Sequence, residues 1–316
     1  MSNSSPRIPS PLLPLAATLS WGAMFPIAAH VLHRVDPVNL TALRYGVATL
    51  GFVAILWFVE GRGALRFEGR FLSLFALGSI GFAGFNLLGY LGLEHTEPQN
   101  AAIIVSTMPL ATAVVRWARY GERPARITVG AIAVALVGAG LVVTRGQLST
   151  GWGIGDLYVF AGMLGWVLYT SGAANHPELS PLRYTALSAV GGTISILAIA
   201  SALDVTGVLT LPSPGDLGAE WPGIAFVIAF GALIAVVAWN AGVRRLGAAN
   251  AALFMNLVPV TAFAIRIGGG YRPVAVELIG AALVIAALAG SNLALRRRPA
   301  RAARTNRPVT PSIVRG

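Results

Sequence analysis

Apolar runs of about 20 residues, the length that crosses a bilayer as a helix, follow one another along almost the whole chain. Short polar segments separate them. The runs predict ten spans, near residues 11–32, 38–59, 71–93, 98–118, 126–145, 154–174, 182–203, 221–243, 249–267 and 274–295. Strands of a membrane barrel would alternate apolar and polar residues, and these runs do not. The pattern therefore indicates an all-α membrane protein with ten transmembrane helices.

Composition agrees with this interpretation. Hydrophobic residues make up 55% of the chain and charged residues 11%, whereas a soluble domain carries about 25% charged residues. The first run could instead be a cleaved signal peptide. Only Arg7 precedes it, however, and the run is long and contains Trp21 and two prolines, so we expect a retained span. Without cysteine, the chain has neither disulfides nor thiol chemistry.

All 23 basic residues are arginine, and their distribution predicts the orientation. If residues 1–10 are a cytoplasmic N-terminus, most arginines fall in cytoplasmic loops and in the segment 296–316. Four lie outside: Arg34, Arg145, Arg266 and Arg272. Positive loops face the cytoplasm, so we expect a multi-pass plasma-membrane protein with both termini inside and a basic disordered tail from 296. The same rule, with attraction to anionic lipid, explains the net charge of +11 without a nucleic-acid partner.

Two stretches of the chain repeat each other. "NAAIIVSTMP" begins at Asn100 and "NAALFMNLVP" at Asn250, and "GERP" and "GYRP" follow them in the same order. We infer two copies, 11–145 and 153–295, with five spans each. An odd number of spans makes the copies cross in opposite senses, and such inverted-topology repeats recur in secondary transporters. A duplication that only stabilises a helical bundle is the alternative.

The motifs resemble a known group of membrane proteins. They are "LSWGAMFP", "ALRYGVATL", "NAAIIVSTMPLATAVVRWARYGERP", "GIGDLYVFAGMLGWVLYT" and "NAALFMNLVPVTAFAI". In order and spacing they resemble the drug/metabolite transporter superfamily, in its ten-helix branch with two tandem EamA domains, over roughly residues 11–295. The resemblance implies permease activity on small metabolites. The chain departs from it at Tyr271, where the family often has a glutamate, so a role for the matching Glu122 lacks a counterpart.

Pro109 and Pro259 fall near the middle of the fourth and ninth spans. Proline removes a backbone donor and leaves a carbonyl unpaired one turn earlier. Inside a bilayer that carbonyl needs a partner from protein, water or substrate. Two such bends, with Asn256 beside the second, would supply polar groups to a central cavity. Kinks that serve only packing are the alternative.

Arg44 is the one charged residue well inside a span. It could extend its side chain to the outer headgroups. It could instead face the bundle as the counter-ion of a carboxylate or phosphate, because charges inside membranes tend to be functional. We favour the second interpretation.

Aromatic and amide side chains inside the spans could line an amphipathic cavity for a zwitterionic or aromatic solute. They are Trp21, Tyr90, Trp166, Tyr169 and Trp239, together with Asn86, Asn240 and Asn256. The alternative is that they hold helices together, as membrane asparagines often do. We expect at least some of them to line the path.

Other chemistry has little support. The acidic residues fall in loops or near span ends; Asp156 and Glu277 are the best candidates for coupling, but capping suits both better, so the coupling mechanism stays open. His30 and His33 alone do not make a metal site. Without lysine a Walker A loop is impossible. We therefore expect no catalytic residues, no metal and no cofactor.

The sequence thus predicts a secondary transporter that moves a small metabolite, such as an amino acid or an amphipathic drug, by alternating access. Its partners would be the substrate and the lipid bilayer, and it would be a monomer or homodimer. A membrane-embedded lipid-modifying enzyme and a non-transporting scaffold remain as alternatives.

Overall fold

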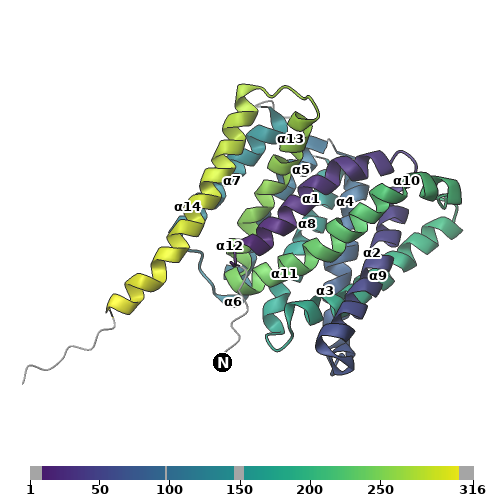
Figure 1. Cartoon of the computed structure of the whole chain (residues 1–316), viewed down its shortest axis with the longest axis horizontal. Coiled ribbons are helices and arrows are strands. Elements are labelled where there is room, and N and C mark those ends of the chain that lie inside the picture. The colour runs from purple at the N-terminus through teal and green to yellow at the C-terminus, as the bar shows by residue number, and fades with distance from the viewer. Residues whose placement is uncertain (1–8, 97, 146–152, 306–316) are drawn as a thin grey trace, which may run out of the picture.

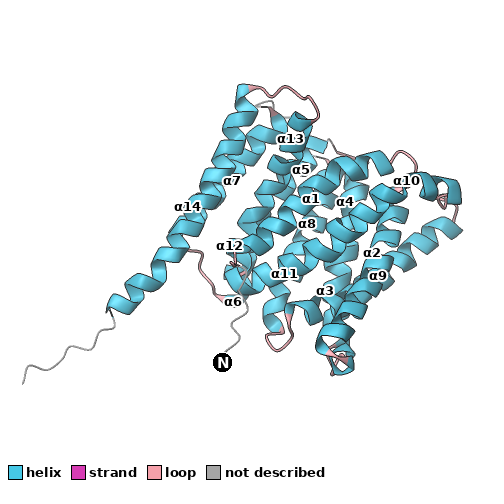
Figure 2. Ribbon diagram, in the orientation of Figure 1, coloured by secondary structure: helices cyan, strands magenta, loops and turns pink. Residues whose placement is uncertain are grey.

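The computed structural model describes residues 9–96, 98–145 and 153–305, and within these ranges the chain is helical with no strand (Figure 2). The first half comprises α1 (Leu12–Val31), α2 (Pro37–Glu60), α3 (Phe71–Gly78), α4 (Phe85–Leu93), α5 (Pro98–Ser106), α6 (Met108–Tyr120) and α7 (Arg126–Thr144). The second comprises α8 (Ile154–Gly172), α9 (Pro181–Val205), α10 (Pro214–Phe226), α11 (Ala235–Leu246), α12 (Ala248–Ala252), α13 (Leu257–Gly268) and α14 (Ala275–Thr305).

Nine helices of the described ranges are long and apolar enough to cross a membrane. A further pair, Asn100–Ser106 and Met108–Tyr120, passes the same test together but is bent by 41°, and counting it as one broken span gives up to ten. The break lies at Thr107, just before Pro109. It agrees with the bend predicted there, because Pro109 cannot donate a hydrogen bond to the carbonyl one turn back.

The outer surface of the bundle is apolar. Phe58 is 81% exposed, Leu72 76% and Leu50 72%, each on a helix that could span a membrane. Large apolar side chains exposed over so wide a surface would be unfavourable in water. A bilayer is the solvent in which this surface is stable.

Corresponding helices of the two halves begin in the same way. Asp36 caps α2 by accepting the Val38 N–H at 2.7 Å, and Pro37 follows it. Ser180 caps α9 by accepting the Arg183 N–H at 2.9 Å, again with proline next. Both follow the usual N-terminal preferences, in which a short polar side chain satisfies a free amide and proline occupies the first turn.

Small residues let the two halves approach closely. A Cβ on Gly138 of α7 would lie 2.6 Å from the Gly280 carbonyl of α14, and one on Gly280 would lie 2.5 Å from the Gly138 carbonyl. Between α2 and α9, the hydroxyls of Thr49 and Thr193 are 2.7 Å apart. Reciprocal contacts of this kind are typical of a two-fold relation, in which the same surface meets itself.

Irregular helix geometry also recurs. A π-helical segment, Ser79–Gly84, joins α3 to α4, and another, Val227–Ile234, joins α10 to α11. The break at Thr107 corresponds in the second half to a 3-10 turn, Leu253–Asn256, which joins α12 to α13. Such departures often mark functional places in helices.

The last helix runs into the segment predicted as a tail. We expect a disordered tail from residue 296; α14 is described as far as Thr305, and residues 306–316 of the tail lie outside the described ranges. The segment is rich in alanine and arginine, which are good helix formers.

The two ends of the bundle are best named by one residue each. The Arg70 end holds the connection 61–70 and the connection between α8 and α9, and lies at the bottom of Figure 1 with the N-terminal end of α1. The Glu220 end lies at the top, with the C-terminal end of α1, the first turns of α10 and the connection between α13 and α14.

Candidate functional site

Three tryptophans from three helices meet at the centre of the bundle. The ring of Trp21 (α1) lies 5.7 Å from Trp166 (α8) and 5.5 Å from Trp239 (α11), measured between centroids. Trp21 donates its Nε1–H to the Gly231 carbonyl at 2.9 Å, where the π-helical segment bulges. We call these three residues the tryptophan cluster. It joins the two halves, because Trp21 belongs to the first and the other two to the second.

Two members of the cluster carry unused hydrogen-bond donors. Nε1 of Trp166 and Nε1 of Trp239 are both buried, and neither has a partner in the structure. Buried tryptophan N–H groups usually find an acceptor, since leaving one unpaired costs about 1–3 kcal/mol. The cluster therefore offers two directed donors on an aromatic wall.

The predicted residues Tyr169 and Asn240 contact each other and join three helices. The Nδ2 of Asn240 donates to the hydroxyl of Tyr169 at 2.7 Å and to Oγ1 of Thr185 at 2.7 Å, tying α11 to α8 and α9. Both side chains are buried. This is the helix-joining function that the sequence left open as an alternative, although Oδ1 of Asn240 is without a partner.

Arg44 is buried inside the bundle, with 5% of the residue exposed. Its Nη2 donates to Oδ1 of Asn86 at 2.5 Å, and its Nη1 lies 3.4 Å from the sulfur of Met24. Its guanidinium carbon lies 4.6 Å from the ring centre of Tyr45. The Nε atom has no partner.

Among the described residues no carboxylate forms an ion pair with Arg44, whereas the pairs that do occur lie near helix ends and connections. A buried charge without a counter-ion costs several kcal/mol. Arg44 also lies close to the tryptophan cluster through Met24. The Met24 sulfur packs against Gly231, where an added Cβ would lie 2.3 Å from it, and the Gly231 carbonyl accepts the hydrogen bond from Trp21. The centre of the bundle thus combines an uncompensated positive charge with an aromatic wall.

The remaining predicted residues lie around this centre. Asn86 (α4) donates to the Phe82 carbonyl at 2.8 Å, which fixes it beside Arg44. Tyr90 lies one turn further along α4 and is half-buried. Pro109 is buried in the first turn of α6, and Pro259 is half-buried in that of α13. Asn256, fully buried, keeps Oδ1 unpaired.

The Arg70 end is closed by polar contacts between α6, α3 and the end of α8. The hydroxyl of Tyr120 donates to the Ser171 carbonyl at 3.3 Å and to Oδ1 of Asn175 at 3.0 Å. Nearby, Nε of Arg70 lies 2.7 Å from the Glu178 carboxylate. A Cβ on Gly172 would lie 2.6 Å from Leu77, so the helices leave little space here.

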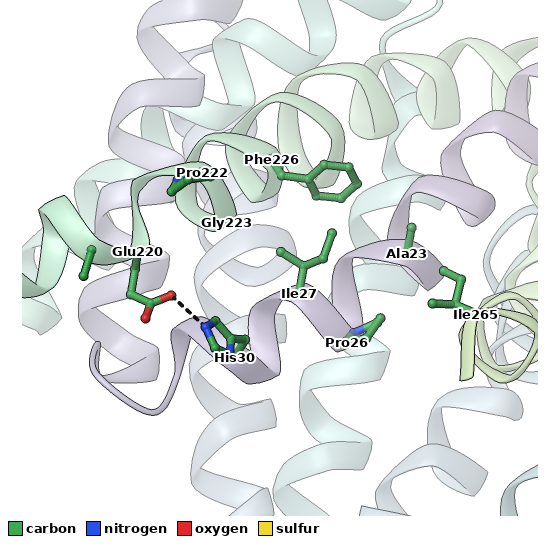
Figure 3. A pocket seen from close by; sticks show the side chains of 10 residues that line it. Ala23, Pro26, Ile27, His30, Glu220, Pro222, Gly223, Phe226 and Ile265 are labelled. Atoms are coloured by element: carbon green, nitrogen blue, oxygen red, sulfur yellow. Dashed lines mark ion pairs between the residues drawn. The ribbon is translucent and has the colours of Figure 1, made fainter. Parts of the chain in front are cut away.

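The Glu220 end is open. A pocket of about 670 Å³ lies between α1, α10 and α13 (Figure 3). Its lining is mostly apolar and consists of Ala23, Pro26, Ile27, His30, Ala219, Glu220, Pro222, Gly223, Phe226 and Ile265. The volume is in the range of small-molecule sites.

Sequence reasoning missed Glu220. We began the eighth span at 221, but the helix begins at Pro214, which places Glu220 within a candidate span and leaves it 6% exposed. The sequence did carry a signal for this earlier helix start. Ser213 caps α10 by accepting the Asp216 N–H at 3.1 Å. A serine before proline, with an acidic residue three positions on, is typical of a helix start.

The two carboxylates considered for coupling are caps, as we expected. Asp156 in the first turn of α8 accepts the Gly153 N–H at 2.8 Å and the Thr96 hydroxyl at 2.5 Å. Glu277 in the first turn of α14 accepts the Val274 N–H at 2.9 Å, and Nε of Arg145 lies 3.2 Å from it. These bonds satisfy both groups locally.

The second copy also has a local replacement for the missing glutamate. In the first copy Glu122 pairs with Arg116. In the second, the guanidinium carbon of Arg266 lies 4.2 Å from the ring centre of Tyr271. The Tyr271 hydroxyl in turn donates to Glu277 at 2.8 Å. A cation–π contact therefore stands where the first copy has an ion pair.

Comparison with known proteins gives a consistent answer. The sequence model of the EamA-like transporter family matches residues 9–144 and 153–293. The chain is 34% identical to the uncharacterized transporter YrdR of Bacillus subtilis (strain 168) over 291 residues, covering 90% of this chain and 91% of the relative. It is 31% identical to the uncharacterized transporter YyaM of the same organism, covering 86% and 89%. A protein of known crystal structure, 20% identical, shares the fold with a TM-score of 0.75 over 91% of this chain and 98% of its own.

Proposed function

Because the chain belongs to the EamA-like transporter family, we propose that it is a secondary transporter of small metabolites that carry an anionic group and an apolar body. Carboxylate-bearing amino acids and amphipathic drugs fall within this class. The observation that carries the proposal is Arg44, a buried cation without a counter-ion beside the tryptophan cluster.

The anionic group follows from charge. In an apolar interior a guanidinium gains most from an ionised partner, because a charge-assisted hydrogen bond is about twice as strong as a neutral one. The unpaired Nε of Arg44 is such a donor. A carboxylate or phosphate of the substrate would remove the cost of burying the charge, so binding energy is concentrated on that group.

The apolar body follows from the tryptophan cluster. Its rings present an aromatic surface, and the N–H groups of Trp166 and Trp239 have no hydrogen-bond acceptor in the structure. A substrate with one ring and polar atoms on its edge would satisfy both features. Asn256, with its unpaired Oδ1, would accept a hydrogen bond from the substrate if it faces the same space.

Alternating access follows from the repeat. Reciprocal contacts and recurring irregular segments support two halves of five spans each, and we propose that they are inverted in the membrane. Equivalent positions are then open at the Glu220 end and closed at the Arg70 end. Exchange of the two conformations between the halves would expose the centre to each side in turn. Arginine-rich loops indicate that the Arg70 end is cytoplasmic.

The test is flux through purified protein in liposomes, with a panel of amino acids, aromatic carboxylates, nucleosides and cationic drugs under imposed ion gradients. Arg44→Gln should abolish flux of an anionic substrate, and Arg119→Gln, the same change at an exposed arginine, should not. Equal flux through both variants would remove Arg44 from the site. Binding without flux across the whole panel would favour a non-transporting scaffold.

A further inference from the structure

We propose that Glu220 is a proton-binding site, and that the proton it takes up allows the pocket at the Glu220 end to close. The proposal rests on the proposed function, since it names the ion coupled to that transport cycle. It starts from a difference between this carboxylate and the other buried acidic groups.

Glu220 is not a helix cap. Asp156 and Glu277, which are similarly buried, accept backbone N–H bonds in the first turns of their helices. Glu220 lies beyond the first turn of α10, where backbone N–H groups already have partners. Its carboxylate faces the pocket (Figure 3), whereas a capping carboxylate faces the backbone N–H groups at a helix start. A carboxylate in a membrane helix beside a cavity is a typical proton or ion site.

The charges around Glu220 do not balance. From α1 and the turn after it, Nε2 of His30 lies 3.7 Å and Nε of Arg34 lies 3.4 Å from the carboxylate. On its own helix, Asp216 lies 3.6 Å from the same arginine. The pocket residue of α13 is Ile265, and the cluster behind α10 that includes Ile224 is apolar. Asp216 and Glu220 thus share Arg34 as their one permanent cation, which leaves one negative charge that a proton on Glu220 would neutralise.

Closing the pocket makes that imbalance costly. The Glu220 side chain is 8% exposed, whereas the His30 side chain is 79% exposed and Arg34 56%. When the apolar lining closes, Glu220 loses its remaining solvent, while its partners can turn outward. Burying an ionised carboxylate without a close partner costs several kcal/mol, and protonation removes most of that cost. The closed state therefore favours the protonated form.

The Arg70 end, which is closed, has a permanent ion pair where the Glu220 end has an unbalanced carboxylate. Aligning the two copies of the repeat shows which positions correspond. The alignment that matches Trp21 with Trp166 also matches His33 with Glu178. The alignment that matches Gly81 with Gly231 also matches Arg70 with Glu220. Arg70 and Glu178 form a close pair at 2.7 Å. The Glu220 end has the charges exchanged, with Glu220 at the position of Arg70, and there one arginine, Arg34, serves two carboxylates. At the closed end two arginines, Arg70 and Arg183, serve Glu68 and Glu178. Closure there depends on a proton, and closure at the Arg70 end does not.

The absence of cysteine makes this measurable without knowledge of the substrate. Ala23→Cys places a single thiol in the pocket wall of the full-length protein in nanodiscs. Its reaction rate with a polar maleimide is measured from pH 8 to pH 5. Rates are divided by those of Val208→Cys, an exposed position near the same end, which corrects for thiol ionisation.

The corrected rate should fall about threefold or more toward pH 5, as protonation shifts the population to the closed state. Glu220→Gln should give a slow rate at every pH, and Glu220→Asp should restore the pH dependence. Asp216→Asn leaves Arg34 to Glu220 alone and should weaken the pH dependence, whereas His30→Gln should retain it. A pH dependence that persists in Glu220→Gln, or that disappears in His30→Gln, overturns the proposal.

Failure of the proposed function would look different. If no member of the substrate panel crosses the bilayer, the permease proposal fails while the labelling result stands. If flux depends on Arg44 but the pH dependence of labelling is the same with and without Glu220, the transport proposal is retained and the proton-site proposal fails.

Discussion

The two ends of the bundle are built from equivalent segments and are in opposite states. At the Arg70 end, α6 reaches the end of α8 through the Tyr120 hydroxyl, and an ion pair covers the junction. At the Glu220 end, the equivalent helices α13 and α1 border a pocket of about 670 Å³. A duplicated fold that is closed at one end and open at the other has the asymmetry that alternating access needs. The side chains at the two ends also differ, with Arg70 and Glu178 paired at one and Glu220 with Arg34 at the other.

The largest effect should come from holding the pocket open. A bifunctional thiol reagent that links Ala23→Cys to Ile265→Cys across the pocket should abolish flux, because the Glu220 end can no longer close. Flux into liposomes before and after cleavage of a reducible linker measures this. Each single-cysteine variant, treated with the same reagent, is the control. Undiminished flux in the linked protein would show that the pocket does not take part in the cycle.

The two π-helical segments should tolerate an extra methyl group unequally. A Cβ on Gly81 would lie 2.4 Å from the Cβ of Tyr169, which is fixed to the backbone, whereas one on Gly231 meets the flexible sulfur of Met24. We expect Gly81→Ala to destabilise the protein by about 1–3 kcal/mol. Gly231→Ala should cost less, because methionine adapts its shape.

Thermal unfolding in detergent measures that difference. Gly89→Ala is the matched control, since a Cβ there meets nothing within 4 Å. Equal unfolding temperatures for the Gly81 and Gly231 variants would mean that the two halves pack alike at this point.

A smaller effect should follow when the closed end loses its hydroxyl contacts. Tyr120→Phe removes the bonds to the Ser171 carbonyl and to Asn175 while keeping the ring. Each of the two bonds contributes about 0.5–1.5 kcal/mol, so the Arg70 end should open at least about fivefold more often. Labelling of a single thiol at Ala173→Cys reports this. An unchanged rate would mean that the tyrosine does not hold the end closed.

The smallest effect should come from acid. The hydrogen bond from Arg183 at 2.9 Å, with the charge of that arginine, holds the pKa of Glu68 below its ordinary value of 4.5. Because the folded state lowers this pKa, the contribution is fully present above pH 4.5 and is lost as the pH falls below it. Exposure to solvent makes it small.

Hydrogen exchange of the connection 61–70 should therefore increase below pH 4.5, after correction for intrinsic rates. Glu68→Gln should show the faster exchange already at neutral pH. If the variant exchanges like the parent protein at neutral pH, the pair does not order this connection.

Much of this protein was readable from residue patterns. Apolar runs become spans because a bilayer forces each of them to satisfy its backbone internally as a helix. The repeated phrases at Asn100 and Asn250 marked equivalent segments, and Pro109 marked the break next to Thr107. Arg44 stood out because a charge within an apolar run is rare.

Packing settled the rest, since each outcome depends on residues far apart in the chain. Asn240 and Arg44 looked alike as candidates, yet Tyr169 and Thr185 hold the amide nitrogen of the first between helices, while the second is a buried charge without a carboxylate partner among the described residues. Trp21 finds its acceptor 210 residues away. Glu220 faces a pocket only because α1, α10 and α13 meet around it. Local patterns decide which segments enter the membrane. Whether a charged side chain is paired or faces a pocket depends on which helices become neighbours.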